Sequence, residues 1–266
     1  MKNQLIYQVD AFTSHPFGGN PAGVCVLAQA APEAWMRAVA AEMNLAETAF
    51  LYPEGPIWRL RWFTPKVEID LCGHATLGSA HILWQTGVAP ADDVLRFATR
   101  SGELTATQRD AWIELDFPAT PAQPADPPPG LLEALGARAT FVGRSRFDYI
   151  VEVATEAEVR ALTPDFTRLR SVQTRGTVVT SRGDGEYDCV SRFFAPQVGI
   201  DEDPVTGSAH CMVGPHWAAK LGRAELRAFQ ASERGGELRL HMTGDRVRMS
   251  GQAVTVLRGE LLVPLA

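Results

Sequence analysis

Three polar side chains have types and neighbours that suit proton transfer to and from carbon. Glu47 stands at the start of an apolar segment, residues 47–51, His74 lies in a Gly-His-Ala turn, and Asp203 precedes Pro204. A carboxylate shielded from water can remove a proton from carbon and return it, and an imidazole can relay or steady the charge. From the local pattern alone Glu47 is therefore a candidate acid/base group, whereas His74 and Asp203 are polar residues of turns.

Each of the three residues also has an ordinary structural interpretation. Glu47 could be the solvent-facing end of a strand, His74 a capping or core histidine, and Asp203 a turn residue or helix cap. The acidic run 201–203 offers carboxylates for a cation, but consecutive acids converge only in a loop, and only His210 lies nearby. We therefore expect no metal site.

A repeat predicts the elements that position these residues. Residues 61–70 and 192–201 share six identical positions at a constant offset of 131 residues. Each copy predicts a strand, a turn and a helix with free N–H groups at its start, one at Gly73 and one at Gly207-Ser208. The repeated segment could serve packing alone, but it favours a duplication that gave the chain two similar halves. Two helix starts facing a cleft between halves would suit a small carboxylate.

Composition shifts mark the boundary between the two halves. We expect an N-terminal half at 1–118, a proline-rich, semi-rigid linker at 119–130 and a C-terminal half at 131–266. The final strands could pack back on the first half. Strand patterns predominate over helical ones in both halves.

Charge and apolar patterning exclude several classes of partner. The net charge of −6 argues against nucleic acid and against an anionic membrane surface. The start of the chain lacks the pattern of a signal peptide, and no apolar run is as long as a bilayer span. The four cysteines lack Cys-x-x-Cys spacing, so we expect free thiols in a cytoplasmic protein: Cys25, Cys72, Cys189 and Cys211.

Three motifs together resemble those of the PhzF-like phenazine biosynthesis isomerase family. They are Glu-Thr-Ala-Phe at 47–50, Phe-Thr-Pro-x-x-Glu-Ile-Asp-Leu-Cys-Gly-His-Ala-Thr at 63–76, and Asp-Glu-Asp-Pro-Val-Thr-Gly-Ser-Ala-His at 201–210. The resemblance covers nearly the whole chain. It implies an α+β, diaminopimelate-epimerase-like fold of two pseudo-symmetric halves, each a curled, largely antiparallel, barrel-like sheet around a central helix.

The resemblance also implies an activity and a set of site residues. It implies a cofactor-independent, homodimeric isomerase that transfers a proton within a small carboxylic acid, for which trans-2,3-dihydro-3-hydroxyanthranilate is one candidate. Glu47 matches the family's general acid/base. Gly73, His74, Asp203, Gly207 and Ser208 match positions that hold the substrate, and His74 and Asp203 are also candidates to relay protons.

Two other functions stay open at this stage. Amino-acid racemases of the wider fold group use two facing thiols, and Cys72 stands where one of them would be. The second thiol would lie just before Thr206, where Pro204 and Val205 stand instead, so this interpretation is disfavoured. A non-catalytic protein that binds a small ligand or has a regulatory role would keep the pocket without the reaction. The sequence does not identify the substrate.

Overall fold

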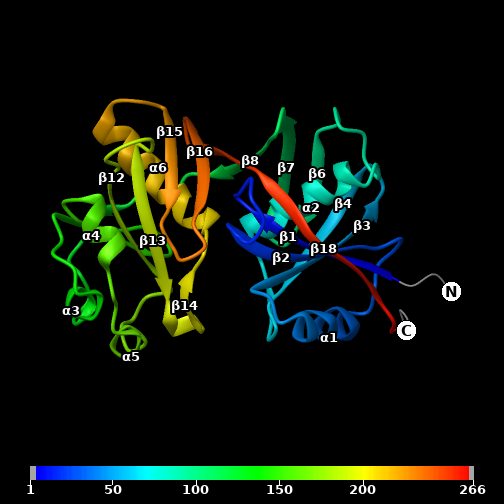
Figure 1. The fold of residues 1–266 in the computed structure, drawn as a ribbon, viewed down its shortest axis with the longest axis horizontal. Helices are drawn as coiled ribbons and strands as arrows, with labels where there is room; N and C mark the ends of the chain where they lie inside the picture. The colour runs from blue at the N-terminus through cyan, green and yellow to red at the C-terminus, as the bar shows by residue number, and fades with distance from the viewer. Residues whose placement is uncertain (1–3, 264–266) are drawn as a thin grey trace. The chain divides into compact units, whose positions relative to one another are not determined.

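The chain folds into two compact units in a computed structural model, which describes residues 4–263 (Figure 1). The first unit extends to Asp116 and takes up the chain again from Ser250, and the second comprises Phe117–Met249. The fold is α+β, with many strands and few helices, which confirms the predicted class.

Strands make up most of the first unit, and one helix lies among them. Figure 1 shows its strands around α2. Its elements are β1 (Gln4–Ala11), β2 (Asn20–Val26), α1 (Glu33–Met43), β3 (Glu47–Glu54), β4 (Ile57–Phe63), β5 (Glu68–Ile69), α2 (Gly73–Gln85), β6 (Leu95–Thr99), β7 (Gly102–Arg109), β8 (Trp112–Pro118) and β18 (Ala253–Leu261). The last of these, β18, pairs antiparallel with β1.

The second unit has the same arrangement, with strands around the helix α6 (Figure 1). Its elements are β9 (Gln123–Pro124), α3 (Leu131–Leu135), β10 (Phe141–Arg144), β11 (Tyr149–Glu152), α4 (Glu156–Ala161), α5 (Phe166–Leu169), β12 (Thr177–Arg182), β13 (Cys189–Ala195), the 3₁₀ turn η1 (Pro196–Val198), β14 (Ile200–Asp203), α6 (Gly207–Leu221), β15 (Glu225–Gln230), β16 (Gly236–Thr243) and β17 (Arg246–Gly251). The proline-rich segment contributes β9, which pairs with β10.

Strand pairing follows the same order in both units. In the first unit β1–β2, β3–β4 and β6–β7 pair antiparallel, whereas β2–β3 and β4–β6 pair parallel. In the second unit β10–β11, β12–β13 and β15–β16 pair antiparallel, whereas β11–β12 and β13–β15 pair parallel. This agreement of five successive pairings confirms the duplication predicted from the repeat.

The central helices are buried on nearly all sides because their side chains are small. In α2, Ala75, Gly78, Ser79 and Ala80 are buried, and the helix packs against β1, β2, β3 and β18. A Cβ atom at Gly78 would lie 3.4 Å from Val9, so this glycine lets the helix approach β1 closely. Close contact with several strands fixes the start of α2 and the side chains there.

Each unit has its own apolar core on the other face of its sheet. The core of the first unit lies between α1 and the strands and consists of Ile6, Cys25, Leu27, Met36, Val39, Ala40, Phe50 and Phe63. The core of the second unit gathers α3, α4 and α5 on β11, β12 and β13, where Val151, Val179 and Phe194 are fully or almost fully buried. The strands thus have core contacts on one face and a central helix on the other.

The acidic run at 201–203 forms a strand rather than a loop. Ile200–Asp203 is β14, which pairs with β13. Alternation along a strand points Glu202 away from its neighbours, and Glu202 binds Arg192, whereas Asp201 binds Arg170. Two of the three carboxylates therefore have cationic partners and do not converge.

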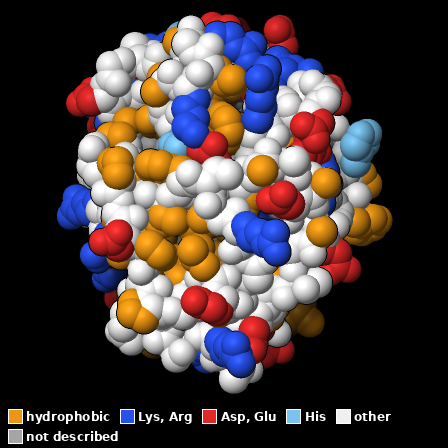
Figure 2. All heavy atoms as spheres, turned by 90° about the vertical axis from the view of Figure 1, so that its left-hand side faces the viewer, with side chains coloured by type: hydrophobic (Ala, Val, Ile, Leu, Met, Phe, Trp, Pro, Cys, Tyr) orange, Lys and Arg blue, Asp and Glu red, His pale blue; other side chains and the backbone are white. Residues whose placement is uncertain are grey.

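The surface visible in Figure 2 mixes charges of both signs with small hydrophobic patches. Such a mixture is typical of the surface of a globular protein. Among the residues that the structure describes, no helix is long and apolar enough to cross a membrane. The four cysteines are buried free thiols.

Candidate active site

Glu47 is the first residue of β3 and is buried. The helix α1 ends at Asn44, which takes a left-handed conformation and turns the chain back toward the sheet. Strand β3 then pairs parallel with β2, with Glu47 opposite Ala22. Only 7% of Glu47 is exposed, so it is not a solvent-facing strand end. A carboxylate in this position needs a polar or cationic partner.

That partner is His74, the second residue of α2. His74 Nε2 lies 3.1 Å from Glu47 Oε2, and both side chains are at most one-tenth exposed. The helix is preceded by Cys72, whose Sγ lies 3.5 Å from His74 Nδ1. Strand β3 and the start of α2 therefore bring a carboxylate, an imidazole and a thiol together in one buried group.

Burial and charge set the protonation states within this group. Burial, the largest effect, raises the pKa of the Cys72 thiol, so Cys72 is neutral near pH 7. Burial alone would lower the pKa of His74, but the contacts with Cys72 and with Glu47 raise this pKa well above its ordinary value. The contact of His74 with Glu47 therefore favours the protonated form of the imidazole.

The contact between Glu47 and His74 is not a well-aligned hydrogen bond. The Oε2 atom of Glu47 is buried and accepts no well-aligned hydrogen bond from any residue between 4 and 263, although it contacts His74. A buried acceptor in this state is costly unless another group approaches it. Glu47 thus has a carboxylate oxygen that is buried and not fully satisfied by the described chain.

The same group is also the one set of potential metal ligands found within the described part of the chain. One ligand atom each of Glu47, Cys72 and His74 lies within 4.8 Å of the others. Thiolate, imidazole and carboxylate are ligands that Zn²⁺ accepts. The sequence-based expectation of no metal stays a prediction, and it concerns this cluster rather than the acids of β14.

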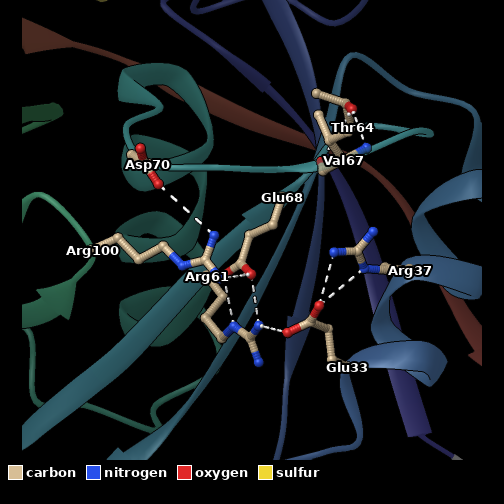
Figure 3. Close-up of polar contacts among 8 residues, drawn as sticks. All are labelled: Glu33, Arg37, Arg61, Thr64, Val67, Glu68, Asp70 and Arg100. Carbon is tan, nitrogen blue, oxygen red and sulfur yellow. Dashed lines mark hydrogen bonds and ion pairs between the residues drawn. The ribbon is translucent and has the colours of Figure 1, made fainter.

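A network of ion pairs fixes the turn that leads into α2. Arg61 of β4 forms two hydrogen bonds of 2.7 Å with Glu68 of β5, and it also contacts Glu33 of α1, as Figure 3 shows. Arg100 contacts Glu68 and Asp70 from another direction. Glu68 has a side chain only 2% exposed, so these partners anchor β5 four residues before Cys72.

The loop before α6 holds Asp203, Thr206 and Gln230 in a hydrogen-bonded group. The hydroxyl of Thr206 donates to Asp203 Oδ2 at 2.5 Å, and the Thr206 N–H donates to Gln230 Oε1 at 2.8 Å. The Gln230 amide donates to the Asp203 carbonyl at 2.7 Å. Helix α6 then begins at Gly207, with Ser208 as its second residue. Gln230 thus fixes Asp203 beside the helix start.

An arginine lies at the same helix start. Arg175 binds both carboxylate oxygens of Asp148, and its NH2 atom lies 3.4 Å from Ser208 Oγ. The side chain of Asp148 is 3% exposed, whereas that of Arg175 is 42% exposed. The guanidinium is therefore anchored at its inner edge and open to solvent at its outer edge.

Strand register shows which residues of the second unit correspond to the acid/base group. Thr48 pairs with Phe63 and Thr177 pairs with Phe194, so Gly176 occupies the position of Glu47. A Cβ at Gly176 would lie 2.2 Å from the ring of Phe193, which fills this space. The second unit thus has no side chain, and no room for one, where the first has its carboxylate.

The helix starts correspond in the same way. Cys72 and Thr206 both cap a central helix, and His74 and Ser208 are both its second residue. Thr206 therefore stands where the second thiol of a two-thiol racemase would be, which argues against that alternative. Cys211, one turn into α6, contacts the Gly207 carbonyl, and burial raises its pKa to about 12.

The six predicted site residues fall into two groups, one in each unit. Glu47, Gly73 and His74 lie together in the first unit, and Asp203, Gly207 and Ser208 lie together in the second. Their joint action on one molecule stays a prediction. Three further residues beside these groups were not predicted: Asp148, Arg175 and Gln230. Of these, only Gln230 had a sequence signal, because it is a polar residue between Phe229 and Ala231 in an apolar stretch.

Comparisons with known proteins extend over nearly the whole chain. Residues 9–259 match the PhzC-PhzF family, described as phenazine biosynthesis-like protein. An uncharacterized isomerase of Halalkalibacterium halodurans is 54% identical over 265 residues, which are 99% of this chain and 100% of the relative. The crystal structure of a PhzF-family phenazine biosynthesis protein of Enterococcus faecalis has 40% identity and a TM-score of 0.95, covering 98% of this chain and 100% of that chain. A hydroxyproline epimerase of Agrobacterium vitis, 10% identical with a TM-score of 0.63, shares the fold over 98% of this chain and 91% of its own.

Proposed function

Because the chain belongs to the PhzC-PhzF (phenazine biosynthesis-like) family and is an isomerase, we propose that it transfers a proton within a small carboxylic acid, with Glu47 as the single general acid/base. The observation that carries this proposal is the buried Glu47 carboxylate, 3.1 Å from His74 Nε2 and with an oxygen that lacks a well-aligned hydrogen bond in the described chain. No metal or cofactor takes part in the proposed step.

The proton moves from one carbon to another through Glu47. The carboxylate removes a proton from a carbon made acidic by a neighbouring double bond or carbonyl, and the bond electrons move into that conjugated system. Glu47 is then a carboxylic acid and returns the proton to a second carbon on the same face. One positioned group of this kind accelerates a reaction by about 10²–10⁴-fold.

His74 and the helix starts stabilise charge during this transfer. The imidazolium of His74 faces the carboxylate before the transfer, and its charge is balanced again when the substrate becomes anionic. The free N–H groups at Gly73 and His74 lie at the positive end of a 13-residue helix and suit an oxyanion. Gly207 and Ser208 provide the same donors in the second unit.

The exchange of Glu47 for glutamine tests the proposal. Glu47→Gln keeps the size of the side chain and removes the proton acceptor, so we expect turnover to fall by about 10²–10⁴-fold with an unchanged fold. Conversion of cyclic and acyclic unsaturated carboxylic acids is followed by NMR in H₂O and in D₂O. Glu54→Gln, at the exposed far end of the same strand, is the matched control.

Wild-type turnover in Glu47→Gln would remove this residue from the mechanism. Ligand binding without any product would instead favour the non-catalytic alternative. Exchange of the α-proton of a free amino acid that depends on Cys72 would revive the racemase. The homodimer and the cytoplasmic location implied by the resemblance also stay predictions.

A further inference from the structure

We propose that Arg175 binds the carboxylate group of the substrate, at a site that it forms with Ser208 at the start of α6 and that Asp148 holds in place. This inference rests on the proposed function, because it concerns the same substrate. It assigns to the second unit a binding site for a carboxylate, and it adds Arg175 to the residues that select the substrate.

The contacts of Arg175 fix the guanidinium in one orientation. Its Nε atom donates to Asp148 Oδ1 at 2.8 Å, its NH2 atom donates to Asp148 Oδ2, and its Cζ atom lies 5.0 Å from the centroid of the Phe147 ring. Asp148 is nearly inaccessible to water, so the pair is anchored from the protein side. A guanidinium held in this way loses little side-chain freedom when a ligand binds.

The outer edge of the guanidinium has N–H donors that do not bind Asp148. Arginine carries five N–H groups, and Asp148 uses one on Nε and one on NH2. Within residues 4–263 the NH1 atom has no hydrogen-bond partner, and the remaining NH2 hydrogen is directed at Ser208 Oγ, 3.4 Å away. This edge can bind a carboxylate with two parallel hydrogen bonds, and the Ser208 hydroxyl can donate a third.

Correspondence between the units explains why an arginine belongs here. Gly176 takes the position of Glu47, and Ser208 takes the position of His74. In the first unit the proposed acid/base group, Glu47, gains and loses a proton. In the second unit Arg175 is paired with Asp148 and stays charged at any physiological pH. The second unit is therefore suited to binding an anion and unsuited to moving a proton.

The negative charge of Asp148 predicts the direction in which its removal changes the affinity for a carboxylate. Asp148 holds Arg175 in place, but its negative charge also weakens the attraction of the guanidinium for a second carboxylate. In Asp148→Asn the side-chain amide oxygen can still accept a hydrogen bond, and the negative charge is gone. Carboxylate binding should therefore become tighter in Asp148→Asn, a result that a purely structural ion pair does not predict.

The test compares a carboxylate with its neutral amide on the full-length chain. Calorimetric titration with 2-aminobenzoate and with 2-aminobenzamide is done on the wild type, Asp148→Asn and the double variant Asp148→Asn/Arg175→Gln, which leaves no buried charge unpaired. The control is Arg223→Gln, which removes the ion pair of Arg223 with Asp188 beyond the far end of α6. Melting temperatures confirm that each variant is folded.

We expect four results. Wild type prefers the carboxylate, Asp148→Asn binds it more tightly, the double variant binds it about 10- to 100-fold more weakly than wild type, and the control is unchanged. Binding of the amide should vary little throughout. A wild type without preference for the carboxylate, or a double variant with wild-type affinity, would overturn the proposal.

Failure of this inference can be told apart from failure of the proposed function. If Glu47→Gln abolishes proton transfer but the loss of Arg175 leaves carboxylate binding unchanged, the inference is overturned and the proposed function stands. Carboxylate binding that depends on Arg175, in a chain where Glu47→Gln changes no reaction, would support the inference and overturn the proton-transfer mechanism.

Discussion

The buried pair of Glu47 and His74 predicts a large coupling free energy between these two residues. The variants Glu47→Gln, His74→Gln and the double variant form a cycle that isolates the pair from the effects of each single change. Two unit charges 3.1 Å apart attract each other by about 5 kcal/mol at an effective dielectric constant of 20. Desolvation of two nearly inaccessible groups offsets part of this, so we expect a coupling of about 2–3 kcal/mol.

This coupling should depend on pH in a defined direction. The contacts raise the pKa of His74 in the folded state above its unfolded value near 6.5. A group with a raised folded-state pKa contributes its full stability below the unfolded pKa and loses it as the pH rises through the folded pKa. The coupling should therefore be complete at about pH 6 and fade in alkaline solution.

Chemical denaturation of the four proteins at pH 6, 7.5 and 9 measures the coupling. The free energy of unfolding is extrapolated to water for each protein, and the cycle is closed at each pH. A coupling below about 0.5 kcal/mol at pH 6 would refute the assignment of an imidazolium–carboxylate pair. A coupling that grows from pH 6 to pH 9 would refute the assigned direction of the His74 pKa.

Three further predictions concern the Cys72 thiol, the ion pair of Arg192 with Glu202, and metals. Cys72→Ser should keep activity within about tenfold of wild type, because the buried thiol is neutral and takes no proton; a loss as large as that of Glu47→Gln in the same NMR assay would contradict this. Arg192→Met should cost about 3 kcal/mol in denaturant unfolding, since it breaks two hydrogen bonds to Glu202 and two to backbone carbonyls, whereas exposed Arg37→Met should cost less than about 1 kcal/mol; equal costs would contradict the role of the pair. Prolonged dialysis against a chelator should leave turnover unchanged, and a loss restored by Zn²⁺ would show that the thiol, imidazole and carboxylate hold a functional metal.

The sequence predicted those parts of the site that depend on local order along the chain. The repeated segment predicted β4 and β13 and the helices that follow, because its residues keep their spacing in both copies. It placed Glu47 at the start of a strand for the same reason. The resemblance to a family then named six site residues, of which His74 proved to contact Glu47 directly.

The rest of the site depends on pairing between distant segments and could not be predicted. Asp148 and Arg175 are 27 residues apart and meet only because β11 and β12 are neighbouring parallel strands. Gln230 reaches Asp203 from β15 for a similar reason. The partners of the acids at 201–203, Arg170 and Arg192, likewise come from other segments of the chain.

The ring of Phe193 limits the enzymes that can evolve from this chain. A mutation that gave the second unit a glutamate at position 176 would place its Cβ 2.2 Å from that ring, a distance at which atoms overlap. Removal of the ring alone would leave a cavity and cost about 3–5 kcal/mol. A descendant with an acid/base group in each unit would need both substitutions, and each alone is damaging.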